Sequence, residues 1–112
     1  MSPILTLLAE MRGRLAMYVG ETSLTKLAAF LRGYDYALEK VGGKSDPFLG
    51  DFRDWIHQHF QSSAQSWEDT ILAHSADQED AVHQFWCLLE RYQGEHDGQA
   101  TVQPSQAKAK AG

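Results

Sequence analysis

Apolar residues recur along most of this chain at the spacing of an amphipathic α-helix. They return every three or four positions over residues 4–11, 24–41, 48–60, 67–74 and 81–92. Because one helical turn holds about 3.6 residues, this spacing places the apolar side chains of each segment on one face. The sequence therefore predicts an all-α fold, a compact bundle of four to five short helices with residues 24–41 as the central one.

Capping and breaking residues predict where these helices begin and end. Side chains that accept hydrogen bonds from the first backbone N–H groups of a helix stand before the periodic segments: Ser2, Thr22 or Ser23, Ser66 and Asp77. Glycines follow the second and the last segment, at Gly42-Gly43 and at Gly94. We expect them to end these two helices.

One short apolar segment does not show the helical pattern. Residues 15–20, Leu-Ala-Met-Tyr-Val-Gly, are bounded by Gly13 and Gly20. A short apolar run between turn residues is typical of a buried strand, but no partner strand is visible elsewhere in the chain. The sequence leaves two alternatives for this segment, a buried loop or one short strand.

The periodic pattern stops near the C-terminus. From residue 95 on, Gly, Gln, Thr, Pro and Ser and an alternating Ala-Lys run replace it. Such a composition does not bury enough apolar surface to fold. We therefore expect residues 1–94 to form a single helical domain and residues 95–112 to form a disordered, flexible tail.

Size and composition fit one small domain in a reducing compartment. The chain has 112 residues, of which 43% are hydrophobic, enough for one core. No apolar run approaches the roughly 20 residues of a spanning helix, and the N-terminus has no cationic leader. Cys87 is the only cysteine, so no intramolecular disulfide is expected. We expect a cytoplasmic protein without membrane association.

Charge is distributed very unevenly along the chain. Residues 46–97 hold eleven Asp and Glu residues against two arginines, a net charge of −9, while the whole chain carries −5. A one-sided negative field attracts cationic partners and repels phosphate backbones. The four cations Arg12, Arg14, Lys26 and Arg32 are dispersed beside this acidic half and make a poor nucleic-acid footprint. We expect a basic protein partner and no nucleic acid.

The residues that suggest catalysis or metal binding do not form a recognised motif. His57 and His59 are two positions apart, so on a helix they point to different faces and cannot hold one ion. His83 and Cys87 lie four positions apart and are expected to touch, but nothing in the sequence supplies a third group to orient them. We expect no enzyme activity, no metal and no cofactor.

Trp86 is an aromatic residue that the core pattern does not use. It lies off the stripe formed by Phe85, Leu89 and Tyr92. We expect it to be partly exposed and to serve as an apolar contact residue. Six other aromatic residues fall on the helix stripes and are expected to build the core: Phe48, Phe52, Trp55, Phe60, Trp67 and Phe85.

A resemblance to known proteins rests on short motifs spread over residues 1–92. They include Arg14 with Met17-Tyr18-Val19-Gly20, then Gly33-Tyr34, then Ser66-Trp67. In these motifs the chain resembles small bacterial helical proteins with an R-x-x-M-Y-x-G segment. Some of those proteins resemble immunity partners of secreted toxins. The resemblance implies a helical fold and an immunity role.

Charge and resemblance together give a functional hypothesis. The chain is expected to be a protein–protein interaction module, an immunity or antagonist protein that binds a basic partner such as a toxin through an acidic face. The binding residues expected on that face are Asp51, Asp54, Glu68, Asp69, Glu79, Asp80 and, as an apolar anchor, Trp86. The alternative is a regulatory adaptor or homo-oligomeric helical module without a toxin partner, with the acids serving helix capping and solubility.

Overall fold

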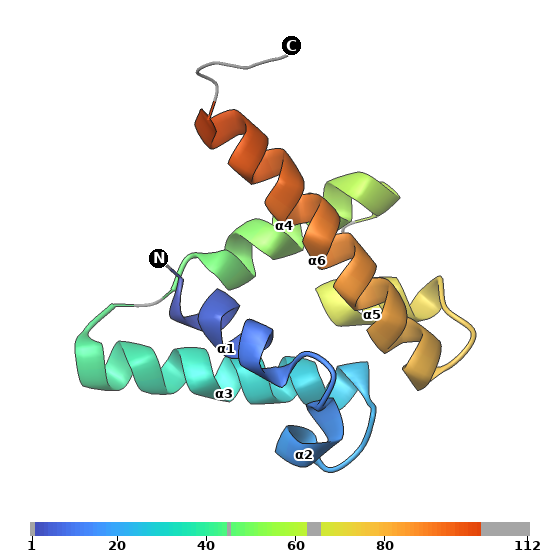
Figure 1. Cartoon of the computed structure of the whole chain (residues 1–112), viewed down its shortest axis with the longest axis horizontal. Helices are drawn as coiled ribbons and strands as arrows, with labels where there is room; N and C mark the ends of the chain where they lie inside the picture. Colours follow the sequence, from blue (N-terminus) through green and yellow to red (C-terminus); the bar gives the residue numbers. More distant parts are fainter. Residues whose placement is uncertain (1, 45, 63–65, 102–112) are drawn as a thin grey trace.

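The described part of the protein is entirely helical. The computed structural model describes residues 2–44, 46–62 and 66–101, and within them it contains six α-helices and no strand (Figure 1). The helices are α1 (Pro3–Met11), α2 (Leu15–Val19), α3 (Leu24–Gly42), α4 (Phe48–Phe60), α5 (Trp67–Ala73) and α6 (Gln78–Thr101). The predicted all-α fold is confirmed. None of the six helices is long and apolar enough to cross a membrane, as far as the described residues go.

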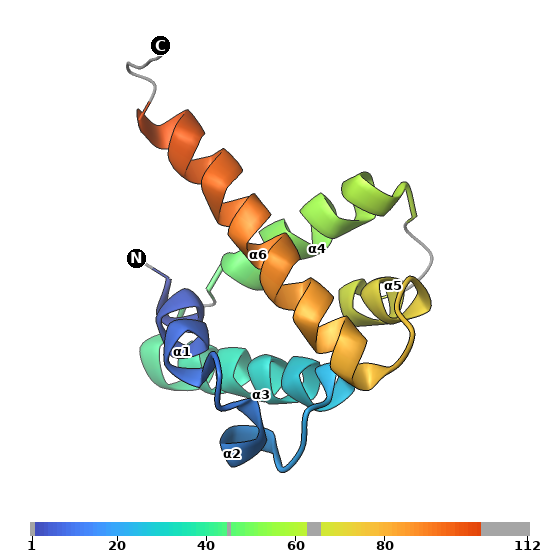
Figure 2. The same ribbon diagram turned by 45° about the vertical axis from the view of Figure 1, so that its right-hand side comes forward.

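Helix α3 lies at the centre of the packing, as its apolar stripe predicts. It contacts α1, α2, α5 and α6, whereas α4 packs mainly on α5. Figures 1 and 2 show α1 and α2 along one side of α3, with α6 crossing α4 and carrying its C-terminal end away from the other helices. In both views α2 lies at one edge of the molecule and the C-terminal end of α6 lies at the opposite edge.

An aromatic cluster around Phe52 joins α4, α5 and α6. The Phe52 side chain is fully buried. Five aromatic rings lie with their centroids 5.4–6.1 Å from its own: Phe48, Trp55, Trp67, Phe85 and Tyr92. Edge-to-face and offset pairs at such distances add to the apolar area that they bury. Of the six aromatic residues expected in the core, Phe48, Phe52, Trp67 and Phe85 are buried, and Trp55 and Phe60 are partly buried against the core.

The segment 15–20 contains a short helix, so both alternatives expected for it were wrong. Leu15–Val19 forms α2, and Gly20 follows in the left-handed conformation with φ of +94°. Its N–H donates to the Ala16 carbonyl at 2.9 Å, which is a helix-ending hydrogen bond. Only Leu15 of this helix is buried, while Met17 is 81% exposed. Five residues are too few for periodicity to reveal a helix that buries a single side chain.

The last helix does not end at Gly94 as expected. Helix α6 continues to Thr101. Glycine inside a helix costs about 1 kcal/mol relative to alanine. Two contacts beyond it favour continuation: Glu95 accepts a hydrogen bond from the Trp55 indole at 2.9 Å, and the His96 ring nitrogen Nδ1 lies 2.8 Å from the Tyr92 carbonyl. The rest of the expected tail, residues 102–112, lies outside the described residues.

Asp46 connects the first turns of α1 and α4. Its side chain accepts hydrogen bonds from the Ser2 hydroxyl at 2.6 Å and from the backbone N–H groups of Ile4 and Phe48, both at 3.0 Å. Burial alone raises the pKa of the Asp46 carboxyl, but these hydrogen bonds to its charged form outweigh burial and lower the pKa. One carboxylate thus satisfies donors at the starts of two helices.

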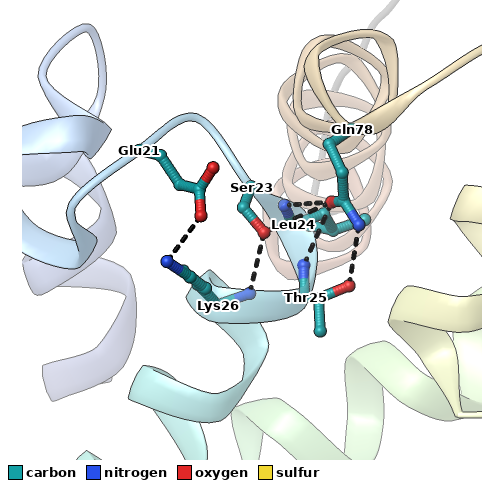
Figure 3. A network of polar contacts seen from close by, with 6 residues as sticks. All are labelled: Glu21, Ser23, Leu24, Thr25, Lys26 and Gln78. Carbon is teal, nitrogen blue, oxygen red and sulfur yellow. Dashed lines mark hydrogen bonds and ion pairs between the residues drawn. The ribbon is translucent and has the colours of Figure 1, made fainter.

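A single glutamine joins the start of α6 to the start of α3. The side-chain oxygen of Gln78 accepts from the Leu24 N–H at 2.9 Å, and its nitrogen donates to the Thr25 hydroxyl at 3.0 Å (Figure 3). Beside it, Ser23 caps α3 by accepting from the Lys26 N–H at 3.2 Å. Backbone N–H groups that a helix leaves unpaired are satisfied here by another helix.

Candidate functional site

An open groove lies between α4 and the second half of α6. Its volume is about 570 Å³. Its walls combine carboxylates, imidazoles and one tryptophan: Asp51, Asp54, Trp55, Gln58, His59, Glu95 and His96. Residues as far apart in the sequence as Trp55 and Glu95, which are 40 positions apart, therefore form one surface.

Helical spacing explains why α4 supplies most of the groove. Asp51, Asp54 and Gln58 are three and four residues apart, so their side chains follow one another along one face of the helix. Asp51 lies in the first turn of α4, where a negative charge is favoured by the helix dipole. Phe52 and Ile56 are fully buried on the face that packs into the core. The carboxylates are thus held on a helix that the core fixes in place.

Trp55 forms the wall that links the two helices. Its ring stacks on Phe52, with 6.1 Å between centroids, and on His59, with 5.2 Å between centroids. Its indole N–H donates to Glu95 Oε1 at 2.9 Å. This hydrogen bond holds the Glu95 carboxylate at the groove, on the same side as Asp51 and Asp54.

Three carboxylates give the groove a negative charge, and Arg53 compensates part of it. Tyr92 is buried next to it, and burial first, then the charges of Asp51 and Asp46, raises the pKa of its hydroxyl. Arg53 contacts Asp54 at 3.1 Å, and both side chains are more than half exposed. An exposed pair of this kind contributes only about 0–1 kcal/mol. A stronger cationic contact can therefore replace Arg53 at little cost.

Glu68 does not belong to an open acidic face, so that part of the expectation was wrong. The residue is only 7% exposed. Both of its carboxylate oxygens accept hydrogen bonds from the Arg32 guanidinium, at 2.6 and 2.7 Å. Burial alone raises the pKa of Glu68, but the hydrogen bonds and charge of Arg32 lower it on balance. Glu68 thus joins α5 to α3, and both of its carboxylate oxygens are already hydrogen-bonded to Arg32.

The other expected carboxylates lie away from the groove. Asp69 is exposed in the first turn of α5, and Glu79 is exposed in the first turn of α6. Asp80 accepts from the Ala76 N–H at 2.9 Å, and this hydrogen bond lowers its pKa. Sixteen residues at 1.5 Å each separate Glu79 from Glu95 by about 24 Å along α6. Of the six expected carboxylates, only Asp51 and Asp54 meet at the groove.

Trp86 is partly exposed, as expected, but it faces α1 and α2 and not the acidic groove. The Arg12 guanidinium carbon lies 5.5 Å from the Trp86 ring centroid, and Arg12 also pairs with Glu90 at 2.6 Å. The Phe85 and Trp86 rings meet edge to face, with 5.0 Å between their centroids. Trp86 therefore has a cationic neighbour and cannot serve as the anchor of the acidic site.

Several groove residues were missed from the sequence. The sequence places Glu95 and His96 in the tail, because Gly94 predicts the end of the last helix. The sequence places Trp55 on a core stripe and predicts no binding role for His59. The available signal was the spacing of Asp51, Asp54 and Gln58, which marks one polar face of α4. No local signal indicates that α6 crosses that face.

The expected contact between His83 and Cys87 is present. The His83 Nε2 atom lies 3.9 Å from the Cys87 sulfur, at exposed positions on α6. No group of three or more His, Cys, Asp or Glu side chains arranged for a metal ion occurs within residues 2–44, 46–62 and 66–101.

Comparison of the chain with protein-family models, with curated proteins and with solved structures gave no match.

Proposed function

We propose that this protein is a protein–protein interaction module that binds a basic partner in the groove between α4 and α6. The observation that carries the proposal is the convergence of Asp51, Asp54 and Glu95, from two helices, on one open groove of about 570 Å³. Carboxylates held in this way accept hydrogen bonds from lysine and arginine side chains of a partner.

The aromatic wall adds selectivity for long cationic side chains. Lysine and arginine bury their aliphatic stems on apolar surfaces while the charged group reaches a polar partner. The Trp55 and His59 rings, stacked with an interplanar angle of 13°, provide such a surface beside the carboxylates. Arginine fits best, since its planar guanidinium both stacks on rings and pairs with carboxylates through two hydrogen bonds.

An immunity or antagonist role is the form of this interaction that we favour. A negative groove accelerates the approach of a basic protein and, once docked, covers the cationic site of that protein. The resemblance carried by Arg14 and residues 17–20 supports the same role in a bacterial cytoplasm. The activity blocked would be one that needs an exposed cationic cleft, as a nuclease toxin does.

The second candidate is an adaptor or homo-oligomeric module. Exposed apolar side chains at α2, Met17 above all, favour self-association through a different part of the molecule. In that case the acidic groove contributes solubility and no specific contact.

Affinity capture with matched variants tests the proposal. The tagged protein is incubated with lysate of its native cell at low salt and eluted with rising salt, and the released proteins are identified by mass spectrometry. The variant Asp51→Asn/Asp54→Asn removes two groove carboxylates. The control Asp69→Asn/Glu79→Asn removes the same charge from exposed positions elsewhere.

We expect a basic protein that the wild type and the control retain and the groove variant loses. Equal retention by both variants would show that the groove is not the binding site. A captured partner is then expressed alone and with this protein. Growth arrest relieved by the wild type but not by the groove variant is expected for an immunity protein; no effect on growth would instead favour the adaptor.

A further inference from the structure

Two histidines line the acidic groove together with its carboxylates. His59 comes from α4 and His96 from α6, and both residues are exposed. Histidine is the side chain whose charge ordinarily changes between about pH 5 and about pH 8. With both imidazoles neutral, the lining has the charge of its three carboxylates, −3, and with both protonated it has a charge of −1. The groove thus combines a binding surface for cations with two groups that become cations at mildly acidic pH.

The His59 ring is part of the surface on which a cationic side chain would stack. It lies on Trp55 with 5.2 Å between centroids and an interplanar angle of 13°, and it meets Phe60 edge to face at 4.8 Å. A guanidinium stacks on aromatic faces of this kind when they are neutral. A protonated His59 carries a positive charge at the same place, so it repels the group that the neutral ring attracts.

The hydrogen bond of His96 determines how its ring becomes charged. Its Nδ1 atom lies 2.8 Å from the Tyr92 carbonyl oxygen. A carbonyl oxygen only accepts hydrogen bonds, so Nδ1 carries a hydrogen in the neutral ring as well as in the charged one. Protonation therefore takes place at Nε2 and does not break this hydrogen bond. The charged ring keeps its position in the groove.

Fixed charges surround the two rings. The lining includes Asp51 and Asp54 on α4 and Glu95 on α6, and the Trp55 indole N–H donates to Glu95 at 2.9 Å. Arg53 contacts Asp54 at 3.1 Å. Aspartate, glutamate and arginine side chains ordinarily do not titrate between about pH 5.5 and about pH 7.5. A change of pH within this range therefore acts on the groove through its histidines.

The other titratable groups near the rings do not alter this conclusion. Tyr92 lies against His96 with 3.9 Å between ring centroids, and burial raises the pKa of its hydroxyl, so Tyr92 stays neutral over this range. Three ionisable residues of α4, α6 and the end of α5 do not line the groove: His57, Arg91 and His74, which stacks on Phe60. His59 and His96 are the groups of the lining that histidine chemistry makes sensitive to mild acid.

We propose that His59 and His96 make the groove a pH-dependent binding site, which holds a basic partner when both rings are neutral and releases it when they are protonated. This dependence rests on the function proposed above for the same groove. An imidazolium about 6 Å from a bound cation weakens binding about threefold even at the dielectric constant of water, so two of them weaken it about tenfold. By linkage, a bound cation in turn makes both rings harder to protonate.

Isothermal titration calorimetry of the full chain with an arginine–alanine peptide tests the pH dependence. The peptide has blocked ends, so its charge is the same at about pH 7.5 and about pH 5.5. At constant low salt we expect the wild type to bind about tenfold more weakly at the lower pH. In His59→Gln/His96→Gln, which cannot titrate at these positions, we expect a change of less than about twofold. The ratio of the two affinities is compared, so a general weakening caused by loss of the His59 ring does not affect the result.

His74→Gln/His83→Gln is the matched control, since both residues are exposed and neither lines the groove. It removes the same number of histidines and should keep the tenfold dependence. Circular dichroism at both pH values checks that each variant is folded. Equal affinity of the wild type at both pH values, or a tenfold loss that persists in His59→Gln/His96→Gln, would overturn the pH dependence and leave the groove as a cation site. No binding at about pH 7.5 would overturn the groove as well.

Proton NMR of the imidazole rings gives a second measurement that requires no change in the groove. The peptide should shift the titration midpoints of His59 and His96 to lower pH and leave that of His83 where it is. This measurement decides the question if the double groove variant binds too weakly for its affinities to be compared. Midpoints of His59 and His96 that a saturating peptide does not lower would overturn the proposal.

Discussion

Replacing Glu68 with glutamine separates a structural role from a binding role. Glu68 stands in the acidic half of the sequence, yet its two oxygens bind the Arg32 guanidinium at 2.6 and 2.7 Å and the residue is buried. Glutamine keeps the volume and one acceptor oxygen but removes the charge and one of the two hydrogen bonds. We predict that Glu68→Gln destabilises the fold and leaves binding at the acidic groove unchanged.

The expected loss is about 2 kcal/mol in the free energy of unfolding. Hydrogen bonds to charged groups contribute about 1.5–3 kcal/mol each, and breaking a fully buried ion pair costs about 3–5 kcal/mol. The Arg32 side chain is 48% exposed, so water solvates the nitrogen that glutamine leaves unpaired. The expected loss in the free energy of unfolding is therefore close to that of one hydrogen bond to a charged group, and below that of breaking a fully buried ion pair. For a domain of this size it lowers the melting temperature by about 10 °C.

Urea denaturation at several pH values measures this loss and its cause. The lowered pKa of Glu68 means that its carboxylate stabilises the fold above the ordinary glutamate pKa of about 4.3, and that this contribution disappears as the pH falls through the lower folded pKa. The difference between wild type and Glu68→Gln should be largest at neutral pH and should shrink below about pH 4.

Asp54→Asn is the control, because it removes an exposed ion pair with Arg53 in which both side chains are more than half exposed. It should cost less than about 1 kcal/mol. A Glu68→Gln variant as stable as Asp54→Asn at neutral pH, or a loss that does not change with pH, would refute the reasoning. Reduced partner capture by folded Glu68→Gln would refute the assignment of Glu68 to the fold.

Three further substitutions test the contacts that fix the fold. Asp46→Ala leaves backbone N–H groups of α1 and α4 without an acceptor and should cost about 2–4 kcal/mol in urea denaturation; a loss below about 1 kcal/mol would contradict the shared cap. Gln78→Ala should speed hydrogen exchange of the Leu24 amide, and unchanged exchange would show that this link contributes little. Phe52→Ala should cost about 3–5 kcal/mol in thermal unfolding, and a fully cooperative variant within 1 kcal/mol of wild type would contradict its central position.

Local sequence rules predicted most of the helices because local physics determines them. The apolar stripe of α3 and the serine caps at Ser2, Ser23 and Ser66 need only neighbouring residues, and all three serines accept a backbone hydrogen bond at a helix start. The sequence did not predict helix α2, because this helix buries only Leu15. The sequence did not predict the full length of α6, because contacts with another helix outweigh the helix-breaking tendency of Gly94.

The site was predicted only in part because it depends on which helices cross. Asp51 and Asp54 share a face of α4 by spacing alone, and that face lines the groove. Glu68 was misassigned because its partner Arg32 lies 36 residues earlier in the chain. Net charge over a segment cannot separate a carboxylate that is already paired from one that faces solvent. Tertiary packing makes that distinction.

The Trp55 indole offers a direct reporter of the groove. Its N–H donates to Glu95 at 2.9 Å, so a cation that binds Glu95 changes the environment of this proton. Trp86 does not line the groove, lies beside Arg12 and serves as an internal reference. Two-dimensional nitrogen–proton NMR records these two indole signals together with that of the third tryptophan, Trp67, in the full-length protein.

Titration with a short arginine-rich peptide at low salt is therefore the most direct measurement of the central claim. We predict a saturable shift of the Trp55 indole signal with the Trp86 signal unchanged. The shift should weaken in Asp51→Asn/Asp54→Asn and persist in Asp69→Asn/Glu79→Asn, which carries the same net charge. A Trp55 signal that does not move, or one that moves equally in both double variants, would contradict a cation-binding groove between α4 and α6.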